Sequence, residues 1–311
     1  MRSSAFVYLR ATCHLFPSQL PELKTLAKAP AVWSCGDLHL ENFGSYKGDN
    51  RLSYFDINDF DESALIPASW DLVRLLTSVR PACAELEFKD DRVRELIDVL
   101  LAAYFKQLQH GSARWLERDT ATGPVQELLA TVSDRKREDF LDSRSTKRGK
   151  KRKLLIDGKK ALAASKEQHK QISEFMEKFA KTQNEPEFYE VLDVARRAQA
   201  VPVAFLHAVQ MNENNYVLRD LQPSADRVSF LEKGNDERRL NELMLAIGRC
   251  TAWSHLRGSG RQGSAIADRL VAFGSDDSWL KVLRKASTTC ADNINVEWKT
   301  YSEAYDNKVF D

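Results

Sequence analysis

Two acidic stretches decide how this chain folds: Cys35-Gly36-Asp37-Leu38-His39-Leu40-Glu41-Asn42-Phe43 and Tyr54-Phe55-Asp56-Ile57-Asn58-Asp59-Phe60-Asp61-Glu62. Between them, Lys47-Gly48-Asp49-Asn50 has the composition of a tight turn, and candidate strands at 42–46 and 52–57 flank it. This arrangement predicts a β-hairpin. Acidic side chains are rarely buried unless they pair with a cation or bind a metal. The acids at the ends of these predicted strands therefore mark a candidate site.

The spacing of the polar residues in this segment suits phosphoryl transfer. That reaction needs a carboxylate beside the acceptor hydroxyl and oxygen ligands that hold Mg²⁺ across the nucleotide phosphates. Protein kinases supply an Asp, an Asn a short distance later in the same loop, and a second Asp after a hairpin. Asp37 and Asn42 have that spacing, and Asp59-Phe60-Asp61 follows the predicted hairpin. Alternation along 54–59 puts Asp59 on the face of the apolar side chains, so we expect it to point toward the core.

The neighbouring segments predict the elements that hold this hairpin. Residues 31–35 form a short apolar run that indicates a buried strand. A helix capped by Ser69 and ended by Pro81 is expected next. A second amphipathic helix is expected at 90–110, with Gly111 as its stop.

The rest of the chain is less regular. Seven Lys and Arg residues fall within 144–153, which we interpret as a solvated loop that leads into a helix at 159–182. A strand is expected at 215–218. Further helices are expected at 236–257, 276–291 and 295–307.

Composition excludes several classes of protein. The chain has 311 residues, and its 46 Lys and Arg nearly cancel its 45 Asp and Glu, so net charge favours neither nucleic acid nor a membrane surface. It has no apolar run long enough to span a membrane, and its first ten residues do not read as a signal peptide. Five scattered cysteines form no CxxC pair. We therefore expect a cytoplasmic protein with reduced thiols, no membrane partner and no nucleic-acid partner.

The first acidic stretch carries a family resemblance. Gly36–Asn42 resembles the His-Gly-Asp-Leu-His-x-x-Asn loop of aminoglycoside and choline kinases, and Asp59–Asp71 is similar in spacing to their Asp-Phe-Gly…Pro-x-Tyr-Asp-Leu segment. More closely, the chain resembles a bacterial kinase-like family named only as a domain of unknown function, number twenty-two fifty-two. The resemblance covers most of the chain, through Phe6–Phe16, Gly36–Gly44, Phe55–Glu62, Trp70–Arg74, Pro202–Val209, Tyr216–Arg227 and His255–Arg257.

This resemblance implies a role for each acid of the site. Asp37 would be the catalytic Asp, and Asn42 and Asp59 would ligate Mg²⁺. Asp61 or Glu62 would make an outer contact to the metal. The implied cofactors are Mg²⁺ and ATP, and the implied substrate is a small molecule that bears a hydroxyl group.

Three further residues have a structural and a functional interpretation. By the resemblance, Asp71 would anchor the catalytic loop through hydrogen bonds, and His39 would shape that loop rather than bind metal. Arg219 would grip a phosphate of the cofactor, or else form an ordinary ion pair with Asp220 or Asp226.

The sequence departs from the family at the nucleotide clamp. A Gly-rich segment and a Lys-containing strand are expected after 191–197, but Arg197 runs straight into Ala198 and a later family segment. Ala11 also stands where the family has Gly. The match of Gly258–Gly263 to GxGxxG follows a helix-like run instead of a strand, so we interpret it as a helix-ending loop.

These observations predict an α+β, protein-kinase-like fold with a large helical lobe, short β-hairpins and a reduced nucleotide-clamping lobe. We expect one domain over 1–311, with catalytic motifs in 1–135, a basic segment in 136–190 and a strand with helices in 191–311. The leading hypothesis is an Mg²⁺- and ATP-dependent phosphotransferase. The alternatives are a catalytically impaired binding module, a phosphohydrolase that uses Asp37, His39, Asp56 and Asp59, and a nucleic-acid binder that uses 144–153.

Overall fold

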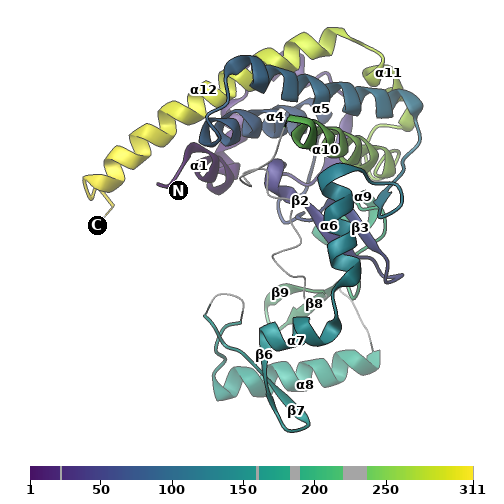
Figure 1. Ribbon diagram of the computed structural model, residues 1–311, viewed down its shortest axis with the longest axis vertical. Helices are drawn as coiled ribbons and strands as arrows, with labels where there is room; N and C mark the ends of the chain where they lie inside the picture. Colours follow the sequence, from purple (N-terminus) through teal and green to yellow (C-terminus); the bar gives the residue numbers. More distant parts are fainter. Residues whose placement is uncertain (22, 159–160, 183–189, 220–236, 311) are drawn as a thin grey trace.

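The computed structural model describes residues 1–21, 23–158, 161–182, 190–219 and 237–310. The protein is α+β, with long helices gathered in one part and short antiparallel strand pairs beside and below them (Figure 1). The predicted fold class is confirmed at this level. Single-turn helices lie between the longer elements at Cys13–Leu15, Phe16–Gln19 (α2), Leu23–Leu26 (α3) and Leu40–Asn42.

Six helices make up what we call the helical part. They are α1 (Ala5–Ala11), α4 (Ala68–Glu85), α5 (Asp90–His110), α10 (Glu237–Arg257), α11 (Ala267–Gly274) and α12 (Ser278–Asp306). All six contribute side chains to one hydrophobic core. The helices α5 and α10 pack closely because Gly248 faces the backbone of α5, where an added Cβ would lie 2.4 Å from the carbonyl oxygen of Leu100.

Helix α5 follows the prediction in both its bounds and its buried face. Its apolar residues recur every three or four positions, and that stripe is buried against the core. The helix ends at His110 because Gly111 adopts a left-handed conformation, with φ of +66°, and its N–H bonds to the carbonyl of Leu108. The predicted stop at Gly111 is confirmed.

Helix α4 differs from the prediction at both ends. It begins at Ala68, and Ser69 does not cap it, because the Ser69 Oγ donates instead to the carbonyl of Leu26 at 2.6 Å. Pro81 does not end the helix, which continues to Glu85. Proline removes one backbone hydrogen bond, and the burial of the residues around Pro81 in the core outweighs that loss.

Two small antiparallel sheets position the acidic stretches. Strand β1 (Ala31–Ser34) pairs with β4 (Ala64–Pro67). Strands β2 (Phe43–Lys47) and β3 (Ser53–Ile57) form the predicted hairpin, and the short β5 (Leu116–Glu117) extends it. The first residue of β2 faces the last residue of β3 in the hairpin register. The acids that follow β3 are therefore brought back beside the end of the loop that precedes β2.

A second part of the molecule lies below the helical part in Figure 1, and we call it the outer part. It contains α7 (Arg137–Arg144), β6 (Ser145–Arg148), β7 (Lys151–Leu154), α8 (Lys166–Thr182), β8 (His207–Met211) and β9 (Asn214–Leu218). Helices α6 (Gly123–Asp134) and α9 (Glu190–Ala198) lie between the two parts. Among the described residues of 137–182, only Phe179 is buried, so this segment has little core of its own.

Three predictions in this half of the chain change. The basic run is a β-hairpin rather than a loop, since Gly149 supplies a left-handed turn residue, with φ of +59°, between β6 and β7. Helix α8 begins at Lys166, and residues 159–160 lie outside the described residues. The two helices predicted after 276 are one continuous helix, α12, because Ile294 at the expected break is buried against the core.

The strand prediction at 215–218 is confirmed by β9, and its partner β8 was not predicted. No helix in the described part of the chain is both long and apolar enough to cross a membrane.

Candidate active site around Asp37

Glycine at position 36 brings the two acidic stretches together. We call residues 35–42 the Asp37 loop and residues 58–62 the exit segment. Gly36 has φ of +86°, and a Cβ at this position would lie 1.6 Å from the carbonyl oxygen of Glu62. Only glycine tolerates both the left-handed conformation and this close approach. The backbone of the exit segment therefore lies directly against the loop that carries Asp37.

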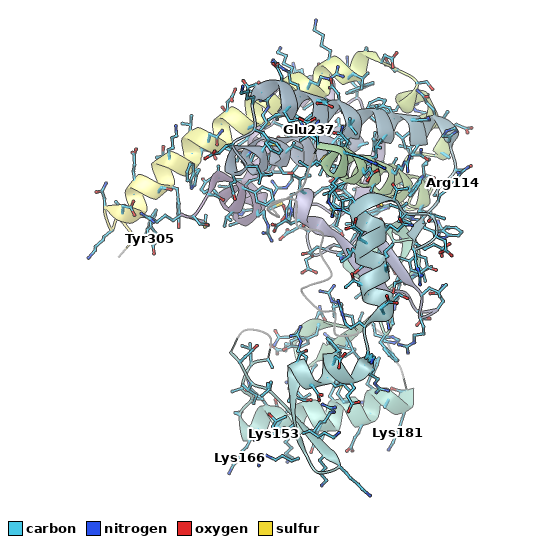
Figure 2. All side chains as sticks on the ribbon, viewed as in Figure 1. Arg114, Lys153, Lys166, Lys181, Glu237 and Tyr305 are labelled. Atoms are coloured by element: carbon cyan, nitrogen blue, oxygen red, sulfur yellow. The ribbon has the colours of Figure 1, made fainter. Side chains whose placement is uncertain are left out.

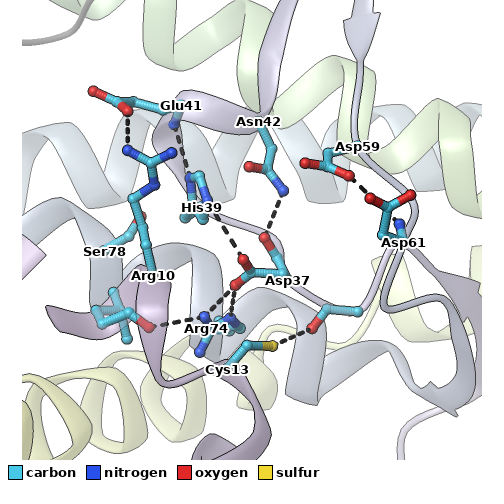
Figure 3. Close-up of polar contacts among 12 residues, drawn as sticks. Arg10, Cys13, Asp37, His39, Glu41, Asn42, Asp59, Asp61, Arg74 and Ser78 are labelled. Atoms are coloured by element: carbon cyan, nitrogen blue, oxygen red, sulfur yellow. Dashed lines mark hydrogen bonds and ion pairs between the residues drawn. The ribbon is translucent and has the colours of Figure 1, made fainter. Parts of the chain in front are cut away.

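Arg74 holds one oxygen of the Asp37 carboxylate, and the other oxygen faces His39 (Figure 3). Arg74 of α4, whose side chain is buried, donates to Oδ1 from Nε at 2.8 Å and also from Nη2. Arg74 is fixed in turn by a bond from Nη2 to the carbonyl of Leu9 and by the ring of Phe16 beneath its guanidinium. The second oxygen, Oδ2, faces His39 Nε2 at 3.6 Å, and the side chain remains 24% exposed.

Burial raises the pKa of Asp37 above its ordinary value of 3.8. The positive charge of Arg74 opposes this rise, and the negative charge of Asp59 adds to it. A carboxylate with a raised pKa is a better proton acceptor than an ordinary surface Asp. The neighbouring Cys13 is no candidate nucleophile, because burial raises the pKa of its thiol to about 12.

Asn42 connects the Asp37 loop to the hairpin. Its Nδ2 donates to the carbonyl of Asp37 at 2.6 Å, and its own backbone carbonyl accepts a bond from the N–H of Asn58 at 2.8 Å. The side chain is buried at 5% exposure. Because its nitrogen is turned toward Asp37, its side-chain oxygen is left to accept a donor or to bind a cation.

Asp59 is placed beside the loop, but its side chain is exposed. The prediction that it points toward the core is wrong, because β3 ends at Ile57 and the strand alternation stops there. Asp61 is exposed beside it, and the Asp61 N–H lies 3.5 Å from Asp59 Oδ1. Burial and the charge of Asp59 raise the pKa of Asp61, while Arg219 opposes the rise. Figure 3 shows Asn42 and Asp59 on neighbouring segments near Asp37.

This donor set fits Mg²⁺ only when phosphates share the metal. No group of three or more His, Cys, Asp or Glu side chains within the described residues is arranged to hold a metal ion. The donors present are the side-chain oxygen of Asn42 and the carboxylate of Asp59, which are the hard ligands that Mg²⁺ prefers. Proteins commonly bind Mg²⁺ through one or two carboxylates, with waters and substrate phosphates completing the shell. The site therefore fits a metal that arrives with a nucleotide.

Three contacts stabilise the Asp37 loop from the side away from Asp59. His39 Nδ1 accepts a bond from the N–H of Glu41 at 3.1 Å, which gives the ring the loop-shaping position expected for it. The side chain of Glu41 pairs with Arg10 of α1, and the N–H of Leu40 donates to Ser78 Oγ of α4. The loop is thus tied to two helices of the core.

Asp71 does not anchor the catalytic loop, contrary to the expectation. Its Oδ2 bonds to Nε2 of His255 at 3.0 Å, and His255 Nδ1 bonds to the hydroxyl of Tyr104 at 2.9 Å. All three side chains are buried. The reason is geometric, since Asp71 lies on the face of α4 that packs toward α5 and α10. This network connects three helices of the core.

Asp56 also lies outside the site. Its carboxylate is buried and accepts bonds from Arg257 Nη2, from the N–H of Ala200 at 3.1 Å and from the N–H of Ile57 at 2.9 Å. Burial raises its pKa and Arg257 opposes the rise. A carboxylate with these partners has no position left for a metal. The phosphohydrolase hypothesis therefore loses one of its four residues.

Arg219 lies immediately after β9 and is exposed. It lines a small cavity of about 30 Å³ together with Asn58, Phe60 and Asp61. The structure therefore places it next to the exit segment, on the Asp61 side of Asp59. The alternative partners, Asp220 and Asp226, lie outside the described residues.

The glycine-rich stretch 258–263 forms the connection between α10 and α11, as its position after a helix predicted. Its Arg261 carbonyl accepts a bond from Trp33 Nε1 at 3.1 Å, and the Ala265 N–H donates to the carbonyl of Ala31. These bonds hold the connection against β1.

Arg74 gives the site its geometry, and it was not among the predicted site residues. The available signal was its position, since Arg74 stands among Leu72, Val73, Leu75 and Leu76 on a helix that is apolar on that face. A charged residue inside an apolar stripe must have a partner. The identity of that partner required the fold, because Asp37 lies on a separate element.

Comparison with known proteins identifies the family. A family model described as "Uncharacterized protein conserved in bacteria (DUF2252)" matches residues 1–201 and 189–304. The two matched stretches overlap at residues 189–201, the region where the sequence lacks the expected Gly-rich and Lys-containing block. Searches of curated proteins and of solved structures found no match. The chain belongs to the bacterial family of uncharacterized proteins DUF2252.

Proposed function

We propose that this protein is an Mg²⁺-dependent phosphotransferase that moves the γ-phosphoryl group of ATP to a hydroxyl of a small molecule. One observation carries the proposal: Asp37 is fixed by Arg74 through one oxygen, remains partly exposed with its other oxygen facing His39, and lies beside the oxygen donors Asn42 and Asp59. A base beside the acceptor hydroxyl and oxygen ligands for Mg²⁺ are two of the parts that phosphoryl transfer needs from a protein. The kinase-like fold is part of the same proposal and rests on the motif spacing.

Asp37 would orient the acceptor hydroxyl and take its proton. The acceptor oxygen forms a bond to the γ-phosphorus as the bond from that phosphorus to the β,γ-bridging oxygen breaks and ADP leaves. The released proton goes to Asp37 Oδ2, the oxygen that Arg74 does not occupy. The raised pKa of Asp37 makes its carboxylate a better proton acceptor than that of an ordinary Asp.

Asn42 and Asp59 would hold Mg²⁺ through their side-chain oxygens. The metal would neutralise charge on the phosphates when it is bound. Arg219 would contact a phosphate from the Asp61 side, because a guanidinium there lies at the edge of the same acidic segment.

The test compares Asp37→Asn with Asp292→Asn, an exposed Asp on α12. Both variants would be incubated with labelled ATP, Mg²⁺ and a mixture of sugars, polyols and amino alcohols. We expect phosphoryl transfer by the wild type and by Asp292→Asn, and a loss of about a thousandfold in Asp37→Asn with ATP binding retained. Substantial transfer by Asp37→Asn would remove Asp37 from the catalytic role.

A second candidate is a kinase-like module that binds a ligand without catalysis. The absence of the Gly-rich and Lys-containing block from the sequence favours it. Such a module would bind Mg²⁺ and ATP through Asn42 and Asp59 without consuming ATP in the presence of any acceptor. The transfer assay separates the two candidates.

A further inference from the structure

A larger cavity, of about 480 Å³, lies between α5, α10 and the segment around β5. We call it the Trp115 cavity. Its lining residues are Lys106, Gln107, Arg114, Trp115, Leu116, Glu117, Thr120, Arg249 and Trp253. Its volume falls within the range of small-molecule sites. It shares no residue with the Asp37 loop or the exit segment, and Figure 2 places Arg114 at the outer edge of the helical part.

Positive charge is concentrated around this cavity. Lys106, Arg114 and Arg249 line it, and the single acid among its lining residues is Glu117. None of the three cations forms an ion pair with a described residue. Like charges gathered without acidic partners repel one another and create a positive potential in a concave site. An anionic ligand would remove that repulsion.

The walls of the cavity are aromatic. Trp115 is 50% exposed, although a large aromatic side chain is usually covered. Trp253 is buried, and its Nε1 donates to Gln107 Oε1 at 3.1 Å, which fixes the indole ring and the amide against each other. An exposed indole beside a cavity provides a face for a flat ring.

The cavity is held in shape by its surroundings. Arg257 donates from Nη1 to the carbonyl of Arg114 at 2.8 Å, and the same guanidinium pairs with Asp56 on β3. Leu116 pairs with Phe55 in the sheet. The loop that carries Trp115 is therefore tied to the hairpin on both sides, and a ligand would meet a preformed site.

We propose that the Trp115 cavity binds a small molecule in which a flat ring carries a dianionic group such as a phosphate. The ring would lie against Trp115, and Arg249, Lys106 and Arg114 would contact the dianion. Arginine offers two parallel donors to a phosphate, and an indole offers a stacking surface, so the two halves of the ligand are recognised separately. Neither half binds as tightly alone.

Calorimetric titration with 1-naphthyl phosphate tests this site, with EDTA present to exclude metal. Inorganic phosphate and 1-naphthol serve as the two half-ligands. We expect 1-naphthyl phosphate to bind about tenfold or more tightly than either half. Equal affinities for inorganic phosphate and 1-naphthyl phosphate would overturn the proposal.

Variants locate the binding. Trp115→Ala and Arg249→Gln should each lower the affinity for 1-naphthyl phosphate about tenfold. Arg249→Lys should lower it less than Arg249→Gln does. Arg238→Gln, on the exposed surface of α10, is the matched control and should bind like the wild type. Far-ultraviolet circular dichroism checks that each variant folds. Unchanged affinity in both Trp115→Ala and Arg249→Gln would refute the site.

The cavity near Arg219 needs its own control, since it also holds an arginine. Arg219→Ala and Asp59→Ala should leave the affinity for 1-naphthyl phosphate unchanged. If Arg219→Ala abolished binding instead, the probe would occupy the cavity of the exit segment and the Trp115 cavity would not be the site.

Discussion

Two Asp–Arg ion pairs, Asp37–Arg74 and Asp56–Arg257, flank the β2–β3 hairpin, and they differ in what surrounds the carboxylate. Asp56 is buried, and its carboxylate is occupied by Arg257 and by two backbone N–H groups. Asp37 is partly exposed, and Arg74 occupies only its Oδ1. Both are held by an arginine, and both have raised pKa values because of burial. The two carboxylates differ in their remaining capacity to accept hydrogen bonds, which is greater at Asp37 than at Asp56.

This difference distinguishes a carboxylate with a structural role from one that can bind a ligand. A buried carboxylate whose partners are complete fixes elements in place, as Asp56 fixes β3 to α10 and to the segment after α9. A partly exposed carboxylate that an arginine fixes through one oxygen can receive a ligand at the other.

Arg257→Met should produce the largest loss of stability. It leaves a buried Asp56 without its cation, which costs about 3–5 kcal/mol of unfolding free energy. The loss should be smaller at low pH, because Arg257 opposes the rise in the Asp56 pKa that burial causes. Without Arg257 that pKa is raised further, so the variant loses more stability than the wild type as pH rises and Asp56 ionises. Urea denaturation measures the loss of unfolding free energy, with Arg238→Met as the control. A loss below about 1 kcal/mol would contradict the structural role.

Gly36→Ala should come next, with a loss of about 2–3 kcal/mol from backbone strain and from the clash with Glu62. Gly158→Ala is the matched control, because Gly158 also has a positive φ, of +71°, but its Cβ would meet nothing within 4 Å. The control should lose only about 1 kcal/mol. Equal losses in the two variants would show that the approach of the exit segment does not constrain Gly36.

Arg74→Gln should move the pH dependence of phosphoryl transfer. The proposed base must be ionised, so activity falls as pH drops through the pKa of Asp37, which burial places above the ordinary 3.8. Arg74 opposes that rise, and its removal should move the acidic limb of the rate profile to higher pH. Arg80→Gln on the same helix is the control. An unmoved limb would mean that Asp37 is not the titrating group.

Tyr104→Phe should have the smallest effect. It removes the hydroxyl that bonds to His255 Nδ1 and leaves one buried polar atom of the Asp71–His255–Tyr104 network without its partner, at a cost of about 1 kcal/mol. Thermal denaturation measures the loss. Phosphoryl transfer should be unchanged, and a large loss of transfer would place this network in the catalytic site instead of the core.

The sequence predicted elements where local pattern and packing agree. The hairpin followed from its turn composition, and α5 followed from its apolar stripe and Gly111, because both signals lie within one segment. The prediction failed at Pro81 and at Ile294, where burial against distant helices keeps a helix intact across a local stop signal. It also failed at 144–153, where charge suggested a loop but Gly149 permits a hairpin.

The candidate site was predictable in its residue types and less so in its geometry. The spacing of Asp37, Asn42 and Asp59 predicted that they lie close together, because a hairpin between them brings the residues after its second strand beside the residues before its first strand. The orientation of Asp59 and the partnership of Asp37 with Arg74 required the tertiary structure, since each depends on where another element ends or packs. The Trp115 cavity left no local signal, because its lining comes from α5, α10 and β5 together.

The most direct test of the central claim is a calorimetric titration of the full chain with ATP, with and without Mg²⁺, beside Asp59→Ala and the control Asp292→Ala. The account predicts a Mg²⁺-dependent binding event that survives in Asp292→Ala and is lost in Asp59→Ala. Binding of ATP that is unaffected by both Mg²⁺ and Asp59→Ala, or no binding by the wild type, would contradict the assignment of Asn42 and Asp59 as the metal ligands of a phosphotransferase.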